Sequence, residues 1–298
     1  MSPGQIPMAE RRQHVALAYV ALSVGISCIG CSAIFVKLAG APGVVSAFYR
    51  VLIAGMVVVP WGVLRRPPLP SRQTFLLIAA GGVFFALDLA LWNTSLLLTS
   101  ATNATLLANN APLWVGLGAL LLFREQLSIR YWCGLVISIA GMAILVGATS
   151  LHGFHWKAGD LLALLASGFY AAYILLTQKA RTRVDTVTFM AISLISTILV
   201  LLGLNLAMGS TLIGYSNRTW WALLGLGLIS HMGGWLAINY ALGHLRAASV
   251  SVSLLAQTIV TALLSIPVLG ESLTVHQIVG GTVVLVGIYL ANQRTAKG

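Results

Sequence analysis

Residues 123–141, FREQLSIRYWCGLVISIAG, recur 146 positions later as residues 269–287, LGESLTVHQIVGGTVVLVG. At this single offset a glutamate, a leucine and two glycines coincide within the two segments, and two further residues coincide upstream of them. The aligned pairs are Glu125 and Glu271, Leu127 and Leu273, Gly134 and Gly280, Gly141 and Gly287, Asn93 and Asn239, and Ala101 and Ala247. One offset shared by several residue types indicates an internal duplication.

The composition indicates an integral membrane protein. Apolar residues make up 58% of the 298 residues and charged residues only 8%, whereas the surface of a soluble domain must carry charge. The apolar runs are about twenty residues long, which is enough to cross a hydrocarbon core of ~30 Å. The formal net charge is +11, but the 17 Lys and Arg lie singly or in pairs between apolar runs. We therefore expect the lipid bilayer, and no nucleic acid, as a partner.

Proline, glycine and charged residues separate the apolar runs into ten predicted spans. The spans are 15–38, 43–64, 73–97, 101–123, 128–148, 158–179, 185–208, 216–240, 247–269 and 274–292. The proline-rich segment 65–70 predicts a rigid loop, and Pro112 and Pro267 predict kinks or helix ends. The expected fold is all-α, with ten transmembrane helices.

Each half contains five spans, an odd number, so the second half must enter the membrane from the opposite side. We expect two inverted five-helix repeats at residues 15–148 and 158–292. Residues 149–157 would link them, with an N-terminal segment at 1–14 and a C-terminal tail at 293–298.

The orientation follows from the basic residues between the spans. Thirteen lie on one side of the ten predicted spans and three on the other. Cytoplasmic loops carry the excess of Lys and Arg, so both termini are expected in the cytoplasm. The predicted location is the bacterial inner membrane, crossed many times.

Metal binding and disulfide bonding are not expected. Cys28, Cys31 and Cys133 lie inside apolar runs rather than in loops. His152 and His155 share one loop, but two ligands do not form a zinc site. No metal or cofactor is predicted.

The repeated segments carry a family resemblance. FREQL at 123–127 and LGESL at 269–273, each followed by glycines seven residues apart, resemble the duplicated signature of the drug/metabolite transporter superfamily, EamA type. Residues 48–50, FYR, are similar to that pattern in the first half, but the second half has TFM at 188–190 and lacks the arginine. The size and layout resemble the YddG-like amino-acid exporters. The resemblance implies a cavity built by spans one to four and six to nine, with spans five and ten as outer supports.

The glycines of spans five and ten also predict a supporting role. These spans contain almost no polar side chains beyond Ser138 and Thr282. Glycines at seven-residue spacing form a narrow face on which helices can pack closely.

The clearest ionisable residues at bilayer depth within the predicted spans are Arg50, Asp88 and His231. Such groups are costly in a bilayer and mark functional sites by default. The offset of 146 aligns Phe85 with His231, so the polar groups are expected near the axis that relates the repeats. Asp88 could contact substrate, carry a proton or form a structural ion pair. His231 could act as a gate, a proton site or a packing residue.

The predicted substrate-binding residues surround these groups. His231, Trp235 and Asn239 are spaced four residues apart and form one helical stripe. Asparagines at matching positions in both halves could instead form hydrogen bonds between helices. The complete predicted site comprises His231, Trp235, Asn239, Asp88, Trp92, Asn109, Gln257, Tyr170 and Tyr173.

An inverted repeat lets two halves exchange conformations, as alternating access requires. The sequence therefore predicts a secondary transporter for small metabolites, foremost aromatic or other amphipathic amino acids, working as an exporter with protons as a possible coupling ion. A multidrug or cationic-metabolite exporter is the alternative within the same superfamily. An intramembrane enzyme would need a nucleophile turn, a second intramembrane aspartate or an HExxH helix, none of which occurs in the sequence. A passive channel would need a filter loop or a ring of like charges.

Overall fold

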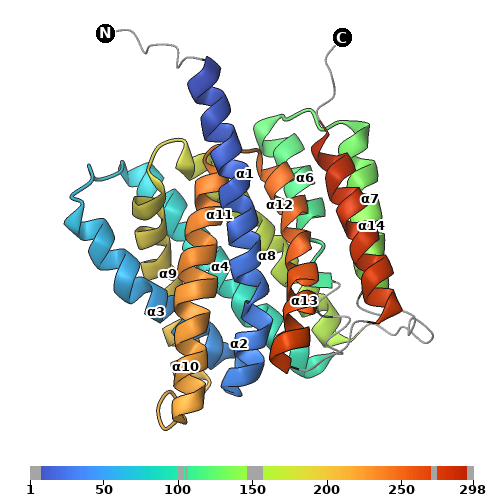
Figure 1. Cartoon of the computed structure of the whole chain (residues 1–298). Helices are drawn as coiled ribbons and strands as arrows, with labels where there is room; N and C mark the ends of the chain where they lie inside the picture. Colours follow the sequence, from blue (N-terminus) through green and yellow to red (C-terminus); the bar gives the residue numbers. More distant parts are fainter. Residues whose placement is uncertain (1–7, 100–103, 105–106, 146–156, 270–273, 294–298) are drawn as a thin grey trace.

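A computed structural model describes residues 8–99, 104, 107–145, 157–269 and 274–293 (Figure 1). Within these ranges the regular structure is entirely helical. The helices are α1 (Met8–Gly30), α2 (Ser32–Ala39), α3 (Gly43–Leu64), α4 (Arg72–Leu98), α6 (Ala111–Phe123), α7 (Ile129–Leu145), α8 (Ala158–Arg181), α9 (Thr186–Ala207), α10 (Asn217–Gly225), the π-helix η2 (Leu226–Gly233), α11 (Gly234–Leu242), α12 (Ala247–Ser253), the 3₁₀-helix η3 (Leu254–Ala256), α13 (Gln257–Leu269) and α14 (Val275–Asn292).

The helices account for all ten predicted spans. Eight helical stretches are long and apolar enough to cross a membrane, and α6 and α7 are shorter apolar helices. Three of the eight stretches combine consecutive elements, because α1 continues into α2, α10 into α11, and α12 into α13. The predicted all-α fold of ten membrane helices is confirmed.

Two contacts show that a two-fold axis relates the repeats, and the antiparallel packing of the equivalent helices α7 and α14 shows that the repeats are inverted. The Ser138 hydroxyl donates to the Val284 carbonyl at 3.5 Å, and these residues are 146 positions apart. The rings of Phe85 and His231, which are related by the same offset, lie 5.7 Å apart. Equivalent residues can meet only where the axis that relates the two halves passes between them. The axis therefore runs through the α7–α14 contact and through the contact between α4 and η2.

The glycines allow α7 and α14 to pack backbone against backbone, side by side in Figure 1. A Cβ atom on Gly134 would lie 2.5 Å from the Gly287 carbonyl, and one on Gly141 would lie 2.9 Å from the Gly280 carbonyl. Since the offset converts the first pair into the second, the two contacts are symmetry mates. This geometry supports the predicted packing role of the four glycines.

The first predicted span is not one continuous helix. It breaks at Cys31, between α1 and α2. The break follows a run of side chains that bond back to the helix, because Ser27 donates to the Ser23 carbonyl at 3.0 Å and the Cys31 thiol to the Ser27 carbonyl at 3.4 Å. Side-chain hydrogen bonds to backbone carbonyls compete with the regular backbone hydrogen bonds of the helix and bend it.

Three other spans also depart from a regular α-helix. Asn109 and Asn110 form a turn before α6, and Pro112 occupies the first turn of that helix, as expected for a residue without an amide hydrogen. The eighth span contains η2, which is flanked and interrupted by glycines, and the ninth contains η3. A π-helical segment inside a membrane helix is frequently found at a functional site.

Hydrogen bonds between the halves occur at both ends of the bundle. We call the end of the bundle at which α3, α6 and α8 terminate the arginine-rich end. There Glu125, which follows α6, accepts a hydrogen bond from the Arg246 Nε atom at 2.9 Å. Gln178 donates to the same Glu125 carboxylate at 3.4 Å and accepts from the Ala247 amide at 3.2 Å.

At the opposite end, the Thr99 hydroxyl donates to the buried Asp160 carboxylate at 2.6 Å. Thr219 donates to the Ala39 carbonyl at 2.8 Å, and the Tyr49 hydroxyl donates to the Leu212 carbonyl. Each of these bonds joins a residue of the first half to one of the second.

Two exposed loop residues provide a test of the predicted membrane orientation. Leu69, between α3 and α4, and Ile213, between α9 and α10, are both exposed and lie at opposite ends of the predicted topology. In a variant without native cysteines, Ile213→Cys is expected to react with a membrane-impermeant maleimide added to intact cells, whereas Leu69→Cys should react only after lysis. External labelling of Leu69→Cys would overturn the cytoplasmic placement of both termini.

Candidate functional site

An aromatic cluster lies where the two halves meet. The ring of Phe85 on α4 stacks on Tyr173 of α8 with a centroid distance of 4.6 Å. Trp235 on α11 presents an edge-to-face contact to each of them, at 4.9 Å from Phe85 and 5.2 Å from Tyr173. Aromatic pairs favour these stacked and perpendicular arrangements. The three rings therefore form a compact apolar wall between α4, α8 and α11.

Two further side chains extend the cluster. Tyr170 on α8 meets Trp235 at 5.9 Å, with the ring planes perpendicular. His231 in η2 lies 6.5 Å from Trp235 and 5.7 Å from Phe85, and only 2% of its surface is exposed. We call Phe85, Tyr170, Tyr173, His231 and Trp235 the central cluster.

Small residues bring the eighth span close enough to build this cluster. A Cβ atom on Gly227 would lie 2.6 Å from Ile53 and 3.3 Å from the Arg50 carbonyl on α3. A Cβ atom on Gly234 would lie 2.7 Å from Ile29 on α1. The glycines within and beside η2 therefore let the backbone of the eighth span approach α1 and α3.

Two charged side chains face the same region. Arg50 on α3 and Asp88 on α4 attract one another electrostatically, and both interact with Tyr170. Arg50 also acts on His231. Arg50 and Asp88 are not among the direct salt bridges within the described part of the chain. The two side chains therefore do not consume each other's hydrogen-bonding groups through a direct ion pair.

Several buried nitrogen atoms in this region have no hydrogen-bond partner among the described residues. They are the Arg50 Nε, His231 Nδ1 and Trp235 Nε1 atoms, together with the Asn239 Nδ2 atom. Native proteins rarely leave buried polar groups unpaired, and each such group needs an explanation. Arg50, Trp235 and Asn239 offer donors and His231 a donor or an acceptor, so the four groups are suited to hydrogen bonds with a polar ligand.

Asn239 also has an architectural role. Its side-chain oxygen accepts a hydrogen bond from the Tyr173 hydroxyl at 3.3 Å, and its backbone carbonyl accepts one from Arg181 at 3.0 Å. Both donors lie on α8, so Asn239 ties α11 to α8. The hydrogen bond between helices, left open as an alternative by the sequence, is thus present.

The contacts above connect five of the nine predicted site residues, namely His231, Trp235, Asn239, Tyr170 and Tyr173. Asp88 lies one helical turn after Phe85 on α4 and interacts electrostatically with Tyr170. Trp92 lies one helical turn beyond Asp88 on α4, Asn109 in the turn before α6, and Gln257 at the start of α13. The contacts described for the cluster do not include these three side chains.

Two residues of the site were absent from the predicted set. Arg50 was recognised as an intramembrane charge in the second span but was not assigned to the site. Phe85 carries no polar group, and its only sequence signal was its alignment with His231.

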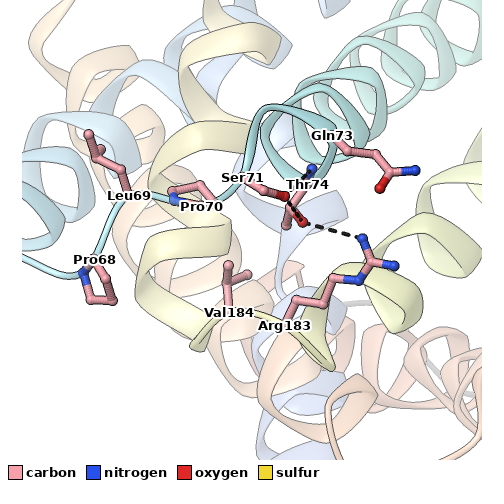
Figure 2. Close-up of a pocket in the computed structure, with 8 residues that line it drawn as sticks. All are labelled: Pro68, Leu69, Pro70, Ser71, Gln73, Thr74, Arg183 and Val184. Carbon is pink, nitrogen blue, oxygen red and sulfur yellow. Dashed lines mark hydrogen bonds between the residues drawn. The ribbon is translucent and has the colours of Figure 1, made fainter.

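A separate pocket lies at the arginine-rich end, away from the central cluster (Figure 2). It has a volume of about 550 Å³ and lies between the proline-rich loop after α3 and the turn after α8. Within it, Arg183 donates to the Thr74 hydroxyl at 3.4 Å, and Ser71 caps α4. The pocket is open, and none of its lining residues belongs to the central cluster.

An inverted repeat of membrane helices with polar groups at the interface of its halves is the architecture of a secondary transporter. Comparison with known families agrees. The chain matches the EamA-like transporter family twice, at residues 16–147 and 157–293, and it belongs to that family.

The relatives of this chain are transporters by name. An uncharacterized transporter of Archaeoglobus fulgidus is 28% identical over 84% of this chain and 87% of its own length. The uncharacterized transporter YdfC of Bacillus subtilis is 22% identical over 81% of this chain and 79% of its own. A solved crystal structure covers 94% of this chain and 98% of its own with a TM-score of 0.75, and at 19% identity it shows a shared fold. The protein is therefore a membrane transporter of the drug/metabolite class.

Proposed function

We propose that this protein exports small amphipathic metabolites, foremost aromatic amino acids, across the bacterial inner membrane by alternating access. It converts no substrate chemically. The observation that carries the proposal is the juxtaposition of the aromatic wall with the charges of Arg50 and Asp88 at the interface of the two halves.

The central cluster offers complementary surfaces for such a molecule. The faces of Trp235, Tyr173 and Phe85 suit a planar apolar side chain, while the charged and hydrogen-bonding groups suit its polar end. Stacking and cation–π contacts of this kind contribute roughly 0.5–2 kcal/mol each. A few of them support the moderate affinity that a carrier needs to release its substrate.

Alternating access would open the two ends of the bundle in turn. Release of Glu125 from Arg246 and Gln178 would open the arginine-rich end. Release of Thr99 from Asp160, and of Thr219 from the Ala39 carbonyl, would open the other. Because each bond crosses between the halves, relative motion of the halves breaks one set while the other persists. Protons remain the proposed coupling ion.

The export of cationic metabolites or drugs is the second candidate. It is favoured by Asp88, an interior carboxylate that could bind an ammonium group. Arg50 opposes it, because a cation entering the site would meet the guanidinium as well.

Transport by purified protein in liposomes tests the proposal. We expect uptake of labelled phenylalanine or tryptophan above that of protein-free liposomes, and little uptake of a nucleoside or of tetraphenylphosphonium. Expression in intact cells should lower the accumulation of the same amino acids, as export requires. Uptake of the organic cation without uptake of any amino acid would replace the first candidate by the second.

A further inference from the structure

Arg50 and Asp88 in the first half have no charged counterparts in the second half. In the second half, the segment that resembles residues 48–50 places Met190 where Arg50 stands, and Met190 is buried in the apolar core. At the 146 offset, Gly234 takes the place of Asp88. The second half thus packs its equivalent helices without either charge. The two charges are therefore not a requirement of the fold shared by the repeats.

The two charged groups do not satisfy each other through direct hydrogen bonds. The Arg50 Nε atom is buried and has no partner among the described residues. Arg50 and Asp88 interact electrostatically but form no direct salt bridge within that part of the chain. A structural ion pair would be expected to close into direct hydrogen bonds, because burial of charges is otherwise costly. An open pair suits a ligand that carries both charges.

The chemistry of each group defines one end of that ligand. Guanidinium groups bind carboxylates through two parallel hydrogen bonds, a geometry that lysine cannot reproduce. A carboxylate accepts hydrogen bonds from an ammonium group. Tyr170 interacts electrostatically with both Arg50 and Asp88, and its ring contacts Trp235 at 5.9 Å. Tyr170 therefore links the charged pair to the aromatic wall.

We propose that Arg50 binds the carboxylate and Asp88 the ammonium group of a zwitterionic α-amino acid, whose side chain packs on Trp235 and its neighbours. This inference rests on the proposed function and narrows it, because the pair makes the zwitterionic head group the determinant of specificity. An amine lacks the partner of Arg50, and a carboxylic acid lacks the partner of Asp88. Each would leave one buried charge unpaired, and sites built in this way reject the incomplete analogue strongly.

Three ligands with one side chain test the assignment, namely L-phenylalanine, 2-phenylethylamine and 3-phenylpropionate. Their affinities are measured by calorimetry on the purified full-length protein. We expect the native protein to prefer phenylalanine to either analogue by at least about thirty-fold, since pairing with a charged group in a buried site has that order of effect.

The variants are expected to relax this preference in opposite directions. Arg50→Gln should bind the amine about as well as phenylalanine while still rejecting the acid. Asp88→Asn should bind the acid about as well as phenylalanine while still rejecting the amine. Arg50→Lys keeps the charge but cannot form two parallel hydrogen bonds to a carboxylate. Its preference for phenylalanine over the amine should therefore lie between those of the native protein and Arg50→Gln. Arg72→Gln makes the same chemical change at an exposed position of α4 and should leave all three affinities unchanged.

A double variant covers the case in which a single substitution unfolds the protein. Arg50→Gln with Asp88→Asn leaves neither charge unpaired, and it should lose the preference for phenylalanine over both analogues. If phenylalanine binds the native protein and the folded variants keep the native order of affinities, the roles of Arg50 and Asp88 are overturned and the proposed function stands. If the native protein binds the amine and no amino acid, the proposed function itself fails.

Discussion

Replacement of Gly134 by leucine is expected to destabilise the fold severely. An added Cβ atom would lie 2.4 Å from the Ala291 amide nitrogen and 2.5 Å from the Gly287 carbonyl oxygen. Both are backbone atoms of α14, so no side chain can rotate away to relieve the overlap. The helices must separate, and the symmetry-related contact between Gly141 and Gly280 is strained with them. We expect a loss of at least about 3 kcal/mol, the upper range for overpacking.

The thermal stability of the purified variant and its yield as a monodisperse peak measure this effect. Gly203→Leu is the matched control, because no atom lies within 4 Å of a Cβ atom built there and the residue is on the exposed side of α9. The control should be as stable as the native protein. Equal stability of Gly134→Leu and Gly203→Leu would show that α7 and α14 do not depend on their close approach. A change in substrate selectivity alone would also contradict the packing role.

The number of spans and their repeat could be predicted because both depend on features that a bilayer enforces locally. Hydrophobic length, charge at the span ends and one common offset do not require knowledge of tertiary contacts. The glycine pairs of α7 and α14 were predictable for the same reason. Their seven-residue spacing specifies one helix face, whatever the partner.

The breaks within the spans could not be predicted in this way. Hydropathy does not change at Cys31, where side chains that bond back to the helix compete with its ladder. Nor does it change at η2, where glycines permit a wider turn and neighbouring helices decide whether that turn forms. The form of η2 depends on its packing against α1 and α3, and tertiary packing cannot be read from a single sequence.

The candidate site was partly predictable. The four-residue spacing of His231, Trp235 and Asn239 places them on one face, and all three are buried in the structure. Asp88 and His231 stood out because charges are rare in the spans. The position of Arg50 beside Asp88 depends on how α3 packs against α4 and η2, and the first two spans of each half align too weakly to reveal it. Trp92 was predicted from its depth in the third span, which matches that of Trp235 in the eighth, and Asn109 and Gln257 were predicted from their polarity within the spans.

Substitution of Trp235 by alanine is expected to weaken binding of an aromatic amino acid by at least about ten-fold, which corresponds to ~1.4 kcal/mol. The indole ring contacts Phe85 at 4.9 Å, Tyr173 at 5.2 Å and Tyr170 at 5.9 Å, and only 4% of the residue is exposed. Removal of the ring takes away the centre of the aromatic wall and the unpaired Nε1 donor. Truncation of a buried aromatic residue also costs about 3–5 kcal/mol of stability, so stability and affinity must be measured separately.

Two further variants separate a binding role from a packing role. Trp235→Phe keeps an aromatic ring without the Nε1 donor, so it should fold nearly normally and still bind several-fold more weakly than the native protein. Trp221→Ala removes the same side chain from a position that is 73% exposed on α10, and its affinity should be unchanged. The dissociation constant for phenylalanine or tryptophan is measured by calorimetry on each variant that elutes as a monodisperse peak. Native affinity in folded Trp235→Ala and Trp235→Phe would place the substrate elsewhere, and Trp235 would then only hold α11 against α4 and α8.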